Sequence, residues 1–369
     1  MAEPFKEYIN EAAVRRLADQ LQAGTPSYGG APTLLACVPS LHALELKDRV
    51  ITVADALRTS LPTDWPQALD VLLRALPAPL PSAQGVGDAF YLWPVLTTVE
   101  RHGLPHPEAS LEALKRMTQS FSAEFAVRPF LVQHPELTWA TLLKWTGDPN
   151  LHVRRWCSEG TRPRLPWGAV LRDSVADPSR GLQLLERLRD DPDRYVQRSV
   201  ANHLNDVSKD HPDRVVQVAQ RWWSDGSKDR RWTVRHGLRT LLKKGDRGAL
   251  SVIGFGEPRL GACQVNADPT TVALGQKIRF EARVLSDATQ PQALQAEWVV
   301  HYVKAKGTQA PKVFRGPRTD LDPGESWSFG KTLSFAPITT RRYYPGIHRI
   351  EVQVNGTVVC GAEFDVVDG

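Results

Sequence analysis

The sequence lacks the features that mark a membrane protein, a secreted protein or a zinc protein. No apolar run approaches the roughly 18 residues that a membrane-spanning helix needs. The N-terminal residues, MAEPFKEYINEAAVRR, mix acids with bases and contain no apolar core, so we expect no signal peptide. The four cysteines, Cys37, Cys157, Cys263 and Cys360, lie far apart without the C-x-x-C spacing of a zinc site. We therefore expect a cytoplasmic protein that neither enters a membrane nor holds a metal.

Motifs for cofactor chemistry are missing as well. The sequence has no glycine-rich loop that would cradle phosphates, no helix-hairpin-helix motif and no serine nucleophile elbow. His203 and His236 have no Cys or Asp at a spacing suited to joint metal coordination. We expect that an enzyme with this sequence works without a cofactor, through its own side chains.

What the sequence does have is an uneven distribution of charge. Its 369 residues are enough for two domains, and 41% hydrophobic with 24% charged residues is ordinary for a globular protein. Residues 120–247 hold 23 Lys and Arg against 16 Asp and Glu, together with 7 of the 11 tryptophans. The flanking thirds are nearly balanced, with 10 against 13 before this region and 13 against 12 after it. Basic residues interleaved with aromatics indicate a nucleic-acid surface, although a solvated face is the plainer alternative.

The first two thirds of the chain have the periodicity of short helices separated by turns. Apolar residues recur at helical spacing, and Pro62, the cluster around Pro79 and the segment Gly103-Leu104-Pro105 interrupt the pattern. Such alternation is typical of an α-solenoid. We expect a helical domain over residues 1–255, whose first helices occupy 5–21, 34–46, 48–60, 65–76, 88–103 and 108–126.

Three segments of this region repeat one pattern. The runs around Val153, Val196 and Val234 align with offsets of 43 and 38 residues, near the roughly 40–47-residue period of HEAT-like repeats. Each copy has an apolar stripe and an opposite polar or basic face. Because such units stack with their inner helices along one concave surface, we expect the polar faces to line a groove.

The first of these runs, DPNLHVRRWCSEGTRPRLPW, concentrates the chemically active side chains. A helix beginning near Asn150 places Arg155 and Glu159 four residues apart on one polar face. We expect Gly160 to end this helix, after which a basic, proline-rich loop leads to Trp167.

The last third has the composition of short strands. Turn signals separate runs at 262–266, 277–285, 294–304, 326–335, 347–354 and 357–366, with a weaker run at 311–318. Asn355-Gly356 between two apolar runs predicts a two-residue hairpin. We expect an immunoglobulin-like β-sandwich over residues 262–369. Cys263 and Cys360 would face each other across such a sandwich or, as we expect, remain reduced core thiols.

The middle third resembles the AlkC branch of the DNA alkylation repair glycosylases. The resemblance is carried by EFAVRPFL, VRRWCSEGTRPRLPW, SVANHLNDVSKDHP and RHGLRTLLKKGD, and it covers roughly residues 120–250. The last third is similar to the immunoglobulin-like domain that some members append. The resemblance implies a base excision repair enzyme that releases 3-methyladenine and 3-methylcytosine from duplex DNA without flipping the base.

The resemblance further implies three active-site carboxylates, Glu124, Glu159 and Asp206. An N3-alkylated base carries positive charge, and cleavage of its glycosidic bond develops oxocarbenium character on the sugar. A carboxylate beside the sugar stabilises that charge and positions or deprotonates a water. Glu159 also differs from its sister repeats, which have the neutral Asn202 and Thr240 in its place.

Each acid has a plainer explanation too. Glu159 would form an intrahelical pair with Arg155, and Asp206 would be a turn residue at a helix C-terminus. Glu124, expected near the end of the helix 108–126, would form a surface salt bridge with Arg128.

We expect the side chains of two tryptophans in different surroundings. Trp156 falls on the apolar side of its helix and is expected in the core, whereas Trp167 closes the basic loop and is expected to contact the lesion or its sugar. A set of basic residues is expected to contact phosphates, which positions a protein on DNA without reading sequence. This set is Arg155, Arg162, Arg164, Arg198, Lys209, Arg235, His236, Lys243 and Lys244. The last two are also explained as charges at a helix C-terminus.

Three functions of different classes fit this sequence: a DNA glycosylase, a non-catalytic DNA-binding HEAT-repeat protein and a protein-interaction scaffold. The basic, tryptophan-rich middle third disfavours the scaffold. Acids inside a basic groove disfavour a pure binder, because uncompensated acids weaken phosphate binding. We expect the glycosylase, acting as a monomer on duplex DNA that contains alkylated bases.

Overall fold

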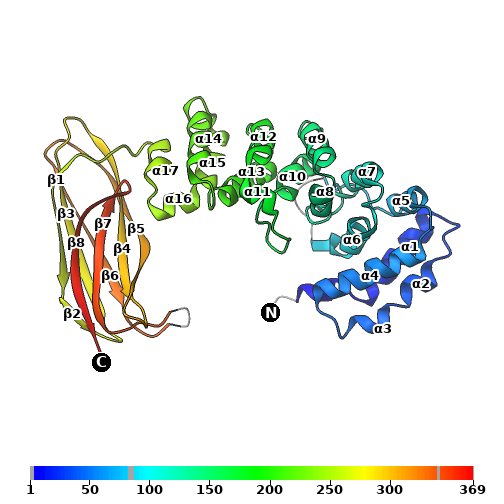
Figure 1. Ribbon diagram of the computed structural model, residues 1–369, viewed down its shortest axis with the longest axis horizontal. Helices are drawn as coiled ribbons and strands as arrows, with labels where there is room; N and C mark the ends of the chain where they lie inside the picture. Colours follow the sequence, from blue (N-terminus) through cyan, green and yellow to red (C-terminus); the bar gives the residue numbers. More distant parts are fainter. Residues whose placement is uncertain (1–3, 82–86, 339–340, 369) are drawn as a thin grey trace. The chain divides into compact units, whose positions relative to one another are not determined.

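The computed structural model describes residues 4–81, 87–338 and 341–368, which form helices followed by strands (Figure 1). The last helix ends at Val252 and the first strand begins at Leu260, so the expected order of an α-solenoid and a β-sandwich is confirmed. The chain divides into two compact units, Met1–Asp210 and His211–Gly369. The predicted domain bounds, 1–255 and 262–369, remain a prediction.

The first unit is helical throughout. The α-helices are, in chain order, α1 (Glu11–Gly24), α2 (Ala31–Leu35), α3 (Val38–Leu41), α4 (Leu46–Ser60), α5 (Trp65–Arg74), α6 (Trp93–His102), α7 (Pro107–Met117), α8 (Arg128–Gln133), α9 (Pro135–Trp145), α10 (Leu151–Gly160), α11 (Arg172–Ala176), α12 (Ser179–Leu188) and α13 (Arg194–Val207). The 3-10 helix η1 (Phe5–Tyr8) precedes the first α-helix, and the 3-10 helix η2 (Gly87–Leu92) lies between α5 and α6.

Four of the predicted helices needed correction. The run 34–46 is not one helix, since α2 ends at Leu35 and α3 covers only Val38–Leu41. The run 88–103 begins as the 3-10 helix η2, and α6 starts only at Trp93. The run 5–21 is broken, because Asn10 caps α1 through its side chain after η1 has ended. The run 108–126 is too long, since α7 ends at Met117 and ten residues outside any helix precede α8. Glu124 therefore lies in an irregular segment between helices and not at a helix C-terminus.

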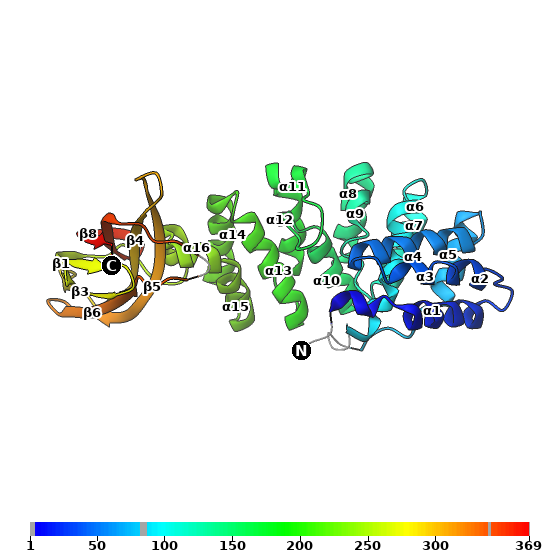
Figure 2. The same ribbon diagram turned by 90° about the horizontal axis from the view of Figure 1, so that it is seen from below.

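Each repeat consists of a pair of packed helices. Helices α9 and α10 pack together, as do α12 and α13, and α10 lies beside α13 (Figure 2). The Asp-Pro segments that precede α10 and α13 supply their caps: Asn150 accepts a hydrogen bond from His152 N, and Asp193 accepts one from Tyr195 N. The predicted start of the helix at Asn150 is thus confirmed.

The aligned valines mark the inward side of each repeat. Val153 on α10, Val196 on α13 and Val234 on α15 (Lys228–Gly237) are all fully buried. Trp156 is also buried, with its indole N–H donating to Ala123 O at 2.9 Å and its ring stacked on Trp145. The expected apolar stripe is therefore the packed face of these helices.

The second unit combines helices with the sandwich. Its remaining helices are α14 (Pro212–Ser224), α16 (Arg239–Lys244) and α17 (Arg247–Val252). Its strands are β1 (Leu260–Asp268), β2 (Thr271–Ala273), β3 (Lys277–Ser286), β4 (Gln292–Val303), β5 (Gln309–Leu321), β6 (Ser326–Ser334), β7 (Gly346–Val354) and β8 (Thr357–Val367). They form one sheet in the order β1-β3-β6 and another in the order β2-β8-β7-β4-β5.

The strands follow the predicted runs, with two differences. The short strand β2, which pairs in parallel with β8, was not predicted, and the weak run 311–318 is the long strand β5. The hairpin at Asn355-Gly356 is confirmed, since both residues have positive φ, 47° and 78°, as a two-residue turn requires. Asn355 also fixes this turn by donating side-chain hydrogen bonds to Gly256 O and Ala293 O.

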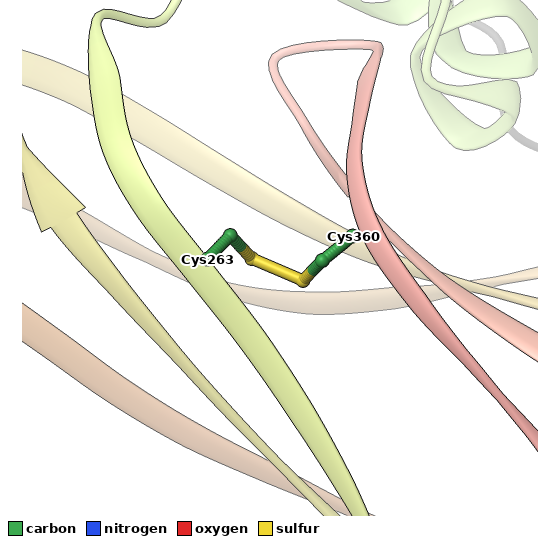
Figure 3. Close-up of a disulfide and its surroundings, with 2 residues drawn as sticks. All are labelled: Cys263 and Cys360. Carbon is green, nitrogen blue, oxygen red and sulfur yellow. A yellow bond between two sulfur atoms is a disulfide. The ribbon is translucent and has the colours of Figure 1, made fainter.

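A disulfide joins the two sheets (Figure 3). Cys263 on β1 and Cys360 on β8 are bonded, with their Cα atoms 5.7 Å apart. Our expectation of reduced thiols for this pair was wrong, because strand order alone does not reveal which side chains meet across a sandwich. Cys37 and Cys157 are free, and burial raises the pKa of both thiols.

The disulfide is expected to stabilise the sandwich. Because it closes a loop of 97 residues, breaking it in Cys263→Ser should lower the free energy of unfolding by about 2–5 kcal/mol. Chemical denaturation followed by circular dichroism measures this loss, and Cys37→Ser serves as the control with a free cysteine. Finding four alkylatable thiols in the unreduced protein would contradict the disulfide.

Candidate active site

The acids predicted to be catalytic lie together on one chain of alternating charges in the first unit. It runs from Glu124 through Arg155, Glu159, Arg162 and Asp206. Arg155 contacts Glu124 Oε2 at 2.5 Å and Glu159 Oε1 at 3.6 Å. Arg162 contacts Glu159 Oε1 at 2.6 Å and Asp206 Oδ2 at 2.8 Å. We call these five residues the acid–arginine chain.

The elements of two repeats bring the chain together. Arg155 and Glu159 lie one turn apart on α10, whereas Asp206 lies in the last turn of α13. Arg162 follows α10 in the loop, where it reaches across to α13. The packing of α10 against α13 thus places side chains more than forty residues apart within hydrogen-bonding distance.

Glu159 is buried, with 6% of its surface exposed, and both of its oxygens have partners. Arg162 donates to Oε1, and Ser199 on α13 donates to Oε2 at 2.6 Å. Burial by itself would raise the pKa of Glu159. The charges of Arg155 and Arg162, with the hydrogen bond from Ser199, outweigh burial and lower that pKa, so the carboxylate stays ionised at neutral pH.

The other two acids differ in how far they are enclosed. Asp206 is buried and accepts from Arg162 on one oxygen and from Lys209 on the other, at 2.9 Å. Glu124 is half-buried and accepts through Oε2 from Arg155 and Ser122. Within the described residues, no hydrogen bond is found to Glu124 Oε1. Glu124 does not form the salt bridge with Arg128 that was its plainer explanation; its partner is Arg155.

Arg128 has a different task, which is to hold the loop that follows α10. It is buried, and its guanidinium donates to the backbone carbonyls of Gly160, Arg162 and Ala169. Burial and the neighbouring charge of Arg162 lower the pKa of Arg128 to about 10, so it remains a cation at neutral pH. The loop therefore has a defined path, which fixes where Arg162 enters the acid–arginine chain.

Gly160 is the last residue of α10, as predicted, and it is also needed for close packing. Its φ is not positive, and Thr161 is the C-cap residue. A Cβ atom at Gly160 would lie 2.6 Å from Val127 Cγ1, which is shorter than any van der Waals contact. The glycine thus lets α10 approach the segment that carries Glu124 and Arg128.

Trp167 lies at the far end of the same loop, with 54% of its surface exposed. It stacks in parallel on Trp93 at 6.5 Å and meets Phe5 edge-on, while Lys47 donates to its carbonyl. Its φ of 66° is unusual for a bulky residue and indicates a conformation imposed by these contacts. No described contact joins it to the acid–arginine chain.

A cavity of about 470 Å³ adjoins Trp167. Trp93, Phe125, Arg128 and Trp167 line it together with the apolar side chains of α4 and α8. Arg128 lines this cavity and also donates to the loop carbonyls, so one residue borders both the cavity and the loop that carries Arg162.

The predicted phosphate contacts fall into two groups. Arg155 and Arg162 are committed to carboxylates, and Arg162 is only 7% exposed. The others lie on or near the surface, as Arg164, Arg198 and Lys209 in the first unit and Arg235, His236, Lys243 and Lys244 in the second. Arg164 forms a two-point pair with Asp210, at 3.0 and 2.9 Å.

Sequence reasoning missed two residues that shape this site. Ser199 occupies the repeat position of Trp156, and this exchange of an aromatic for a hydroxyl was a usable signal. Arg128 was considered only as a salt-bridge partner, although it stands inside the segment EFAVRPFL. Its contacts are with backbone carbonyls, which leave no trace in the sequence.

The described residues contain no helix long and apolar enough to cross a membrane. In the same parts of the chain, no group of three or more His, Cys, Asp or Glu side chains is arranged to hold a metal ion.

Helical repeats that hold three acids among arginines, followed by an immunoglobulin-like sandwich, fit an enzyme of DNA alkylation repair. The family described as DNA alkylation repair enzyme matches residues 115–241, and the C-terminal Ig-like domain of the uncharacterised protein YhaZ matches 262–368. The chain belongs to this family, in its AlkC branch.

Two relatives match over nearly the whole chain. The uncharacterized protein YhaZ of Bacillus subtilis (strain 168) is 36% identical over 364 residues, covering 98% of this chain and 99% of the relative. The solved structure of Pseudomonas fluorescens alkylpurine DNA glycosylase AlkC, bound to DNA containing an abasic site analog, is 34% identical with a TM-score of 0.82. That likeness covers 99% of each chain.

Removal of the central arginine should unfold the site. Arg162→Gln leaves Glu159 and Asp206 buried without the cation that bridges them, so we expect a loss of about 3–5 kcal/mol of stability. Arg164→Gln, which breaks the more exposed pair with Asp210, should cost much less. Urea denaturation compares the two, and equal losses would argue against a structural role for the acid–arginine chain.

Proposed function

We propose that this protein hydrolyses the N-glycosidic bond of cationic N3-alkylated bases, 3-methyladenine and 3-methylcytosine, in duplex DNA. Membership of a DNA alkylation repair family gives the reaction class. The observation that supports the chemistry is the acid–arginine chain, which keeps three carboxylates close together within the helical repeats.

The reaction asks little of a general acid, because the alkylated base already carries a positive charge. As the bond between the base nitrogen and the sugar C1′ breaks, its electron pair goes to the base, which leaves neutral. The sugar then carries the positive charge, and a carboxylate near it lowers the barrier. Water adds its oxygen to C1′ and gives up one proton to a base or to solvent.

We assign the roles of the acids from their environments. Glu159, ionised, held by hydrogen bonds from Arg162 and Ser199 and paired with Arg155, supplies fixed negative charge for the oxocarbenium-like sugar. Glu124, with one oxygen lacking a described partner, is suited to position the water and take its proton. Asp206 adds charge to the same site and anchors Arg162, and the exposed ring of Trp167 offers an aromatic face to the lesion or its sugar.

The mode of binding is part of the proposal. The AlkC relative was solved bound to DNA containing an abasic site analog, and we propose duplex DNA as the partner of this chain as well. We further propose that the base is not flipped, and that the protein acts as a monomer in the cytoplasm. Arg164, Arg198 and Lys209, whose side chains reach the surface of the first unit, are the proposed phosphate contacts there.

One experiment tests the activity itself. The purified protein is incubated with methylated duplex DNA, and the released bases are identified by mass spectrometry. We expect free 3-methyladenine and 3-methylcytosine. A protein that binds the duplex without releasing any base would support the non-catalytic alternative.

Glu159→Gln should abolish most of the excision. The amide keeps the size of the side chain and removes the charge proposed to stabilise the sugar, so we expect single-turnover rates to fall by about a hundredfold or more. DNA affinity should hold, because no phosphate contact is lost. Asp210→Asn is the matched control, since it neutralises an acid that pairs with Arg164 outside the acid–arginine chain. Equal rates for wild type and Glu159→Gln would refute the assignment.

Arg198→Ala should weaken binding to damaged and intact duplex alike. Its exposed side chain is proposed to neutralise one phosphate, so the slope of log K against log salt should become shallower by about one unit. Arg15→Ala on α1 removes a surface arginine that pairs with Glu11 and provides the comparison. If Arg198→Ala keeps both the affinity and the slope of the wild type, this residue does not contact DNA.

A further inference from the structure

A second cavity lies within the unit His211–Gly369, and the proposed reaction makes no use of it. It has a volume of about 490 Å³ and is lined by side chains of α15, α16 and α17 on one side and of β4 and β5 on the other. Trp232, Phe255 and Leu242 give it apolar walls.

Positive charge dominates this cavity. Four of its lining residues are permanent cations, namely Arg235, Arg239, Lys243 and Arg315, and we call them the cation cluster. His236 adds a titratable ring that stacks on Trp232, with 5.1 Å between centroids. The one acid that lines the cavity, among the residues that the structure describes, is Glu297.

Glu297 is enclosed in an unusual way. It is 1% exposed, and its Oε2 atom has no hydrogen-bond partner. Gln353, which lies directly opposite on β7, also has its carbonyl oxygen Oε1 buried without a partner. Both oxygens lie beside Gly245, at 3.6 and 2.8 Å from the position of a Cβ atom there, and the φ of 73° at Gly245 favours glycine.

Two buried acceptors beside the same glycine, neither with a donor, are unfavourable. A proton on Glu297 resolves this, because a carboxylic acid supplies the O–H that the amide oxygen of Gln353 requires. Burial agrees with this assignment, since it raises the pKa of Glu297 to about 7 while the nearby Arg315 lowers it only in part. A neutral Glu297 leaves the cation cluster without this counter-charge.

Other charged groups near Glu297 are engaged elsewhere. Glu351 on β7 pairs with His301 and Arg349, and Arg247 pairs with Glu257. Asp246 caps α17 through Ala249 N. The remaining titratable or charged side chains that face Glu297 come from α15, α16 and β5, and are Arg235, His236, Arg239, Lys243 and Arg315.

We propose that this cavity binds a phosphate group of the DNA backbone through the cation cluster, and that Glu297 must carry a proton while the phosphate is bound. An ionised carboxylate would repel the anion, so binding above neutral pH takes up one proton. A cavity of this size and charge fits a phosphodiester and its sugar, and the aromatic wall suits the apolar face of the nucleotide. The inference rests on the proposed function only in taking DNA as the partner.

Sulfate is the first probe, because it remains a dianion throughout the neutral range and adds no titration of its own. Full-length protein labelled with 5-fluorotryptophan reports on the cavity through the resonance of Trp232, which Trp232→Phe identifies. We expect sulfate to shift this resonance at about pH 6, and its dissociation constant to rise by up to roughly tenfold per pH unit above neutrality. If sulfate does not shift this resonance at about pH 6, the proposal is overturned.

Glu297→Gln removes the titratable carboxyl group and leaves the cation cluster in place, so it tests the two contributions separately. Between about pH 6 and about pH 8.5, its affinity for sulfate should fall much less than that of the wild type. Glu281→Gln is the charge-matched control, since Glu281 is exposed on β3 and pairs with Arg279. An unchanged pH dependence in Glu297→Gln would contradict the role of this residue.

Stability gives a readout that does not involve any ligand. The raised pKa means that the folded wild type loses stability as pH rises from the ordinary carboxyl range to about 7. Glu297→Gln escapes this loss, so its melting temperature should exceed that of the wild type above neutral pH and match it in acid. A lower melting temperature at high pH would show that Glu297 is needed as a carboxylate.

Undamaged duplex DNA distinguishes a nucleic-acid site from a general anion site. In Arg239→Ala and Arg315→Ala, we expect affinity for this duplex to fall by about tenfold at about pH 6. Sulfate binding without any effect on the duplex would overturn the assignment to DNA. Since no lesion or excision is involved, failure of the proposed glycosylase activity leaves this test intact.

Discussion

The arrangement of the site depends on Arg162, a cation that is almost entirely enclosed. Its guanidinium joins an acid of one helical repeat to an acid of the next, so that two carboxylates are held close together. Burial alone would raise the pKa of Glu159, and the charge of Arg162 helps to lower it. The same side chain therefore connects the stacking of α10 on α13 with the electrostatics of the proposed reaction.

Holding this arginine in place requires further contacts away from the acids. Arg128 fixes the loop through three carbonyls, and Gly160 allows the helix carrying Glu159 to come close to the segment carrying Glu124. Such contacts are preorganisation: the donors are already in place before any substrate arrives, so little free energy is spent on reorganising them during reaction. The exposed Trp167 belongs to the same loop, where Lys47 donates to its carbonyl.

Much of this could be predicted where the determinants are local. Asn150 begins its helix because an Asx side chain can accept from a nearby N–H, and Asn355-Gly356 forms its hairpin because both residues tolerate positive φ. The aligned valines gave the repeat because burial follows helical spacing. The position of Glu124, the burial of Arg162 and the bond between Cys263 and Cys360 escaped prediction, because each depends on which distant segment packs beside it.

The disulfide between β1 and β8 also changes the topology of the polypeptide. It joins the first strand of the sandwich to the last, so residues 263–360 form a covalently closed ring. A protease that cuts once inside this ring opens a loop without releasing a fragment, and the two new ends stay attached through sulfur. A sandwich nicked in this way keeps both sheets tethered, and it would separate into pieces only after reduction.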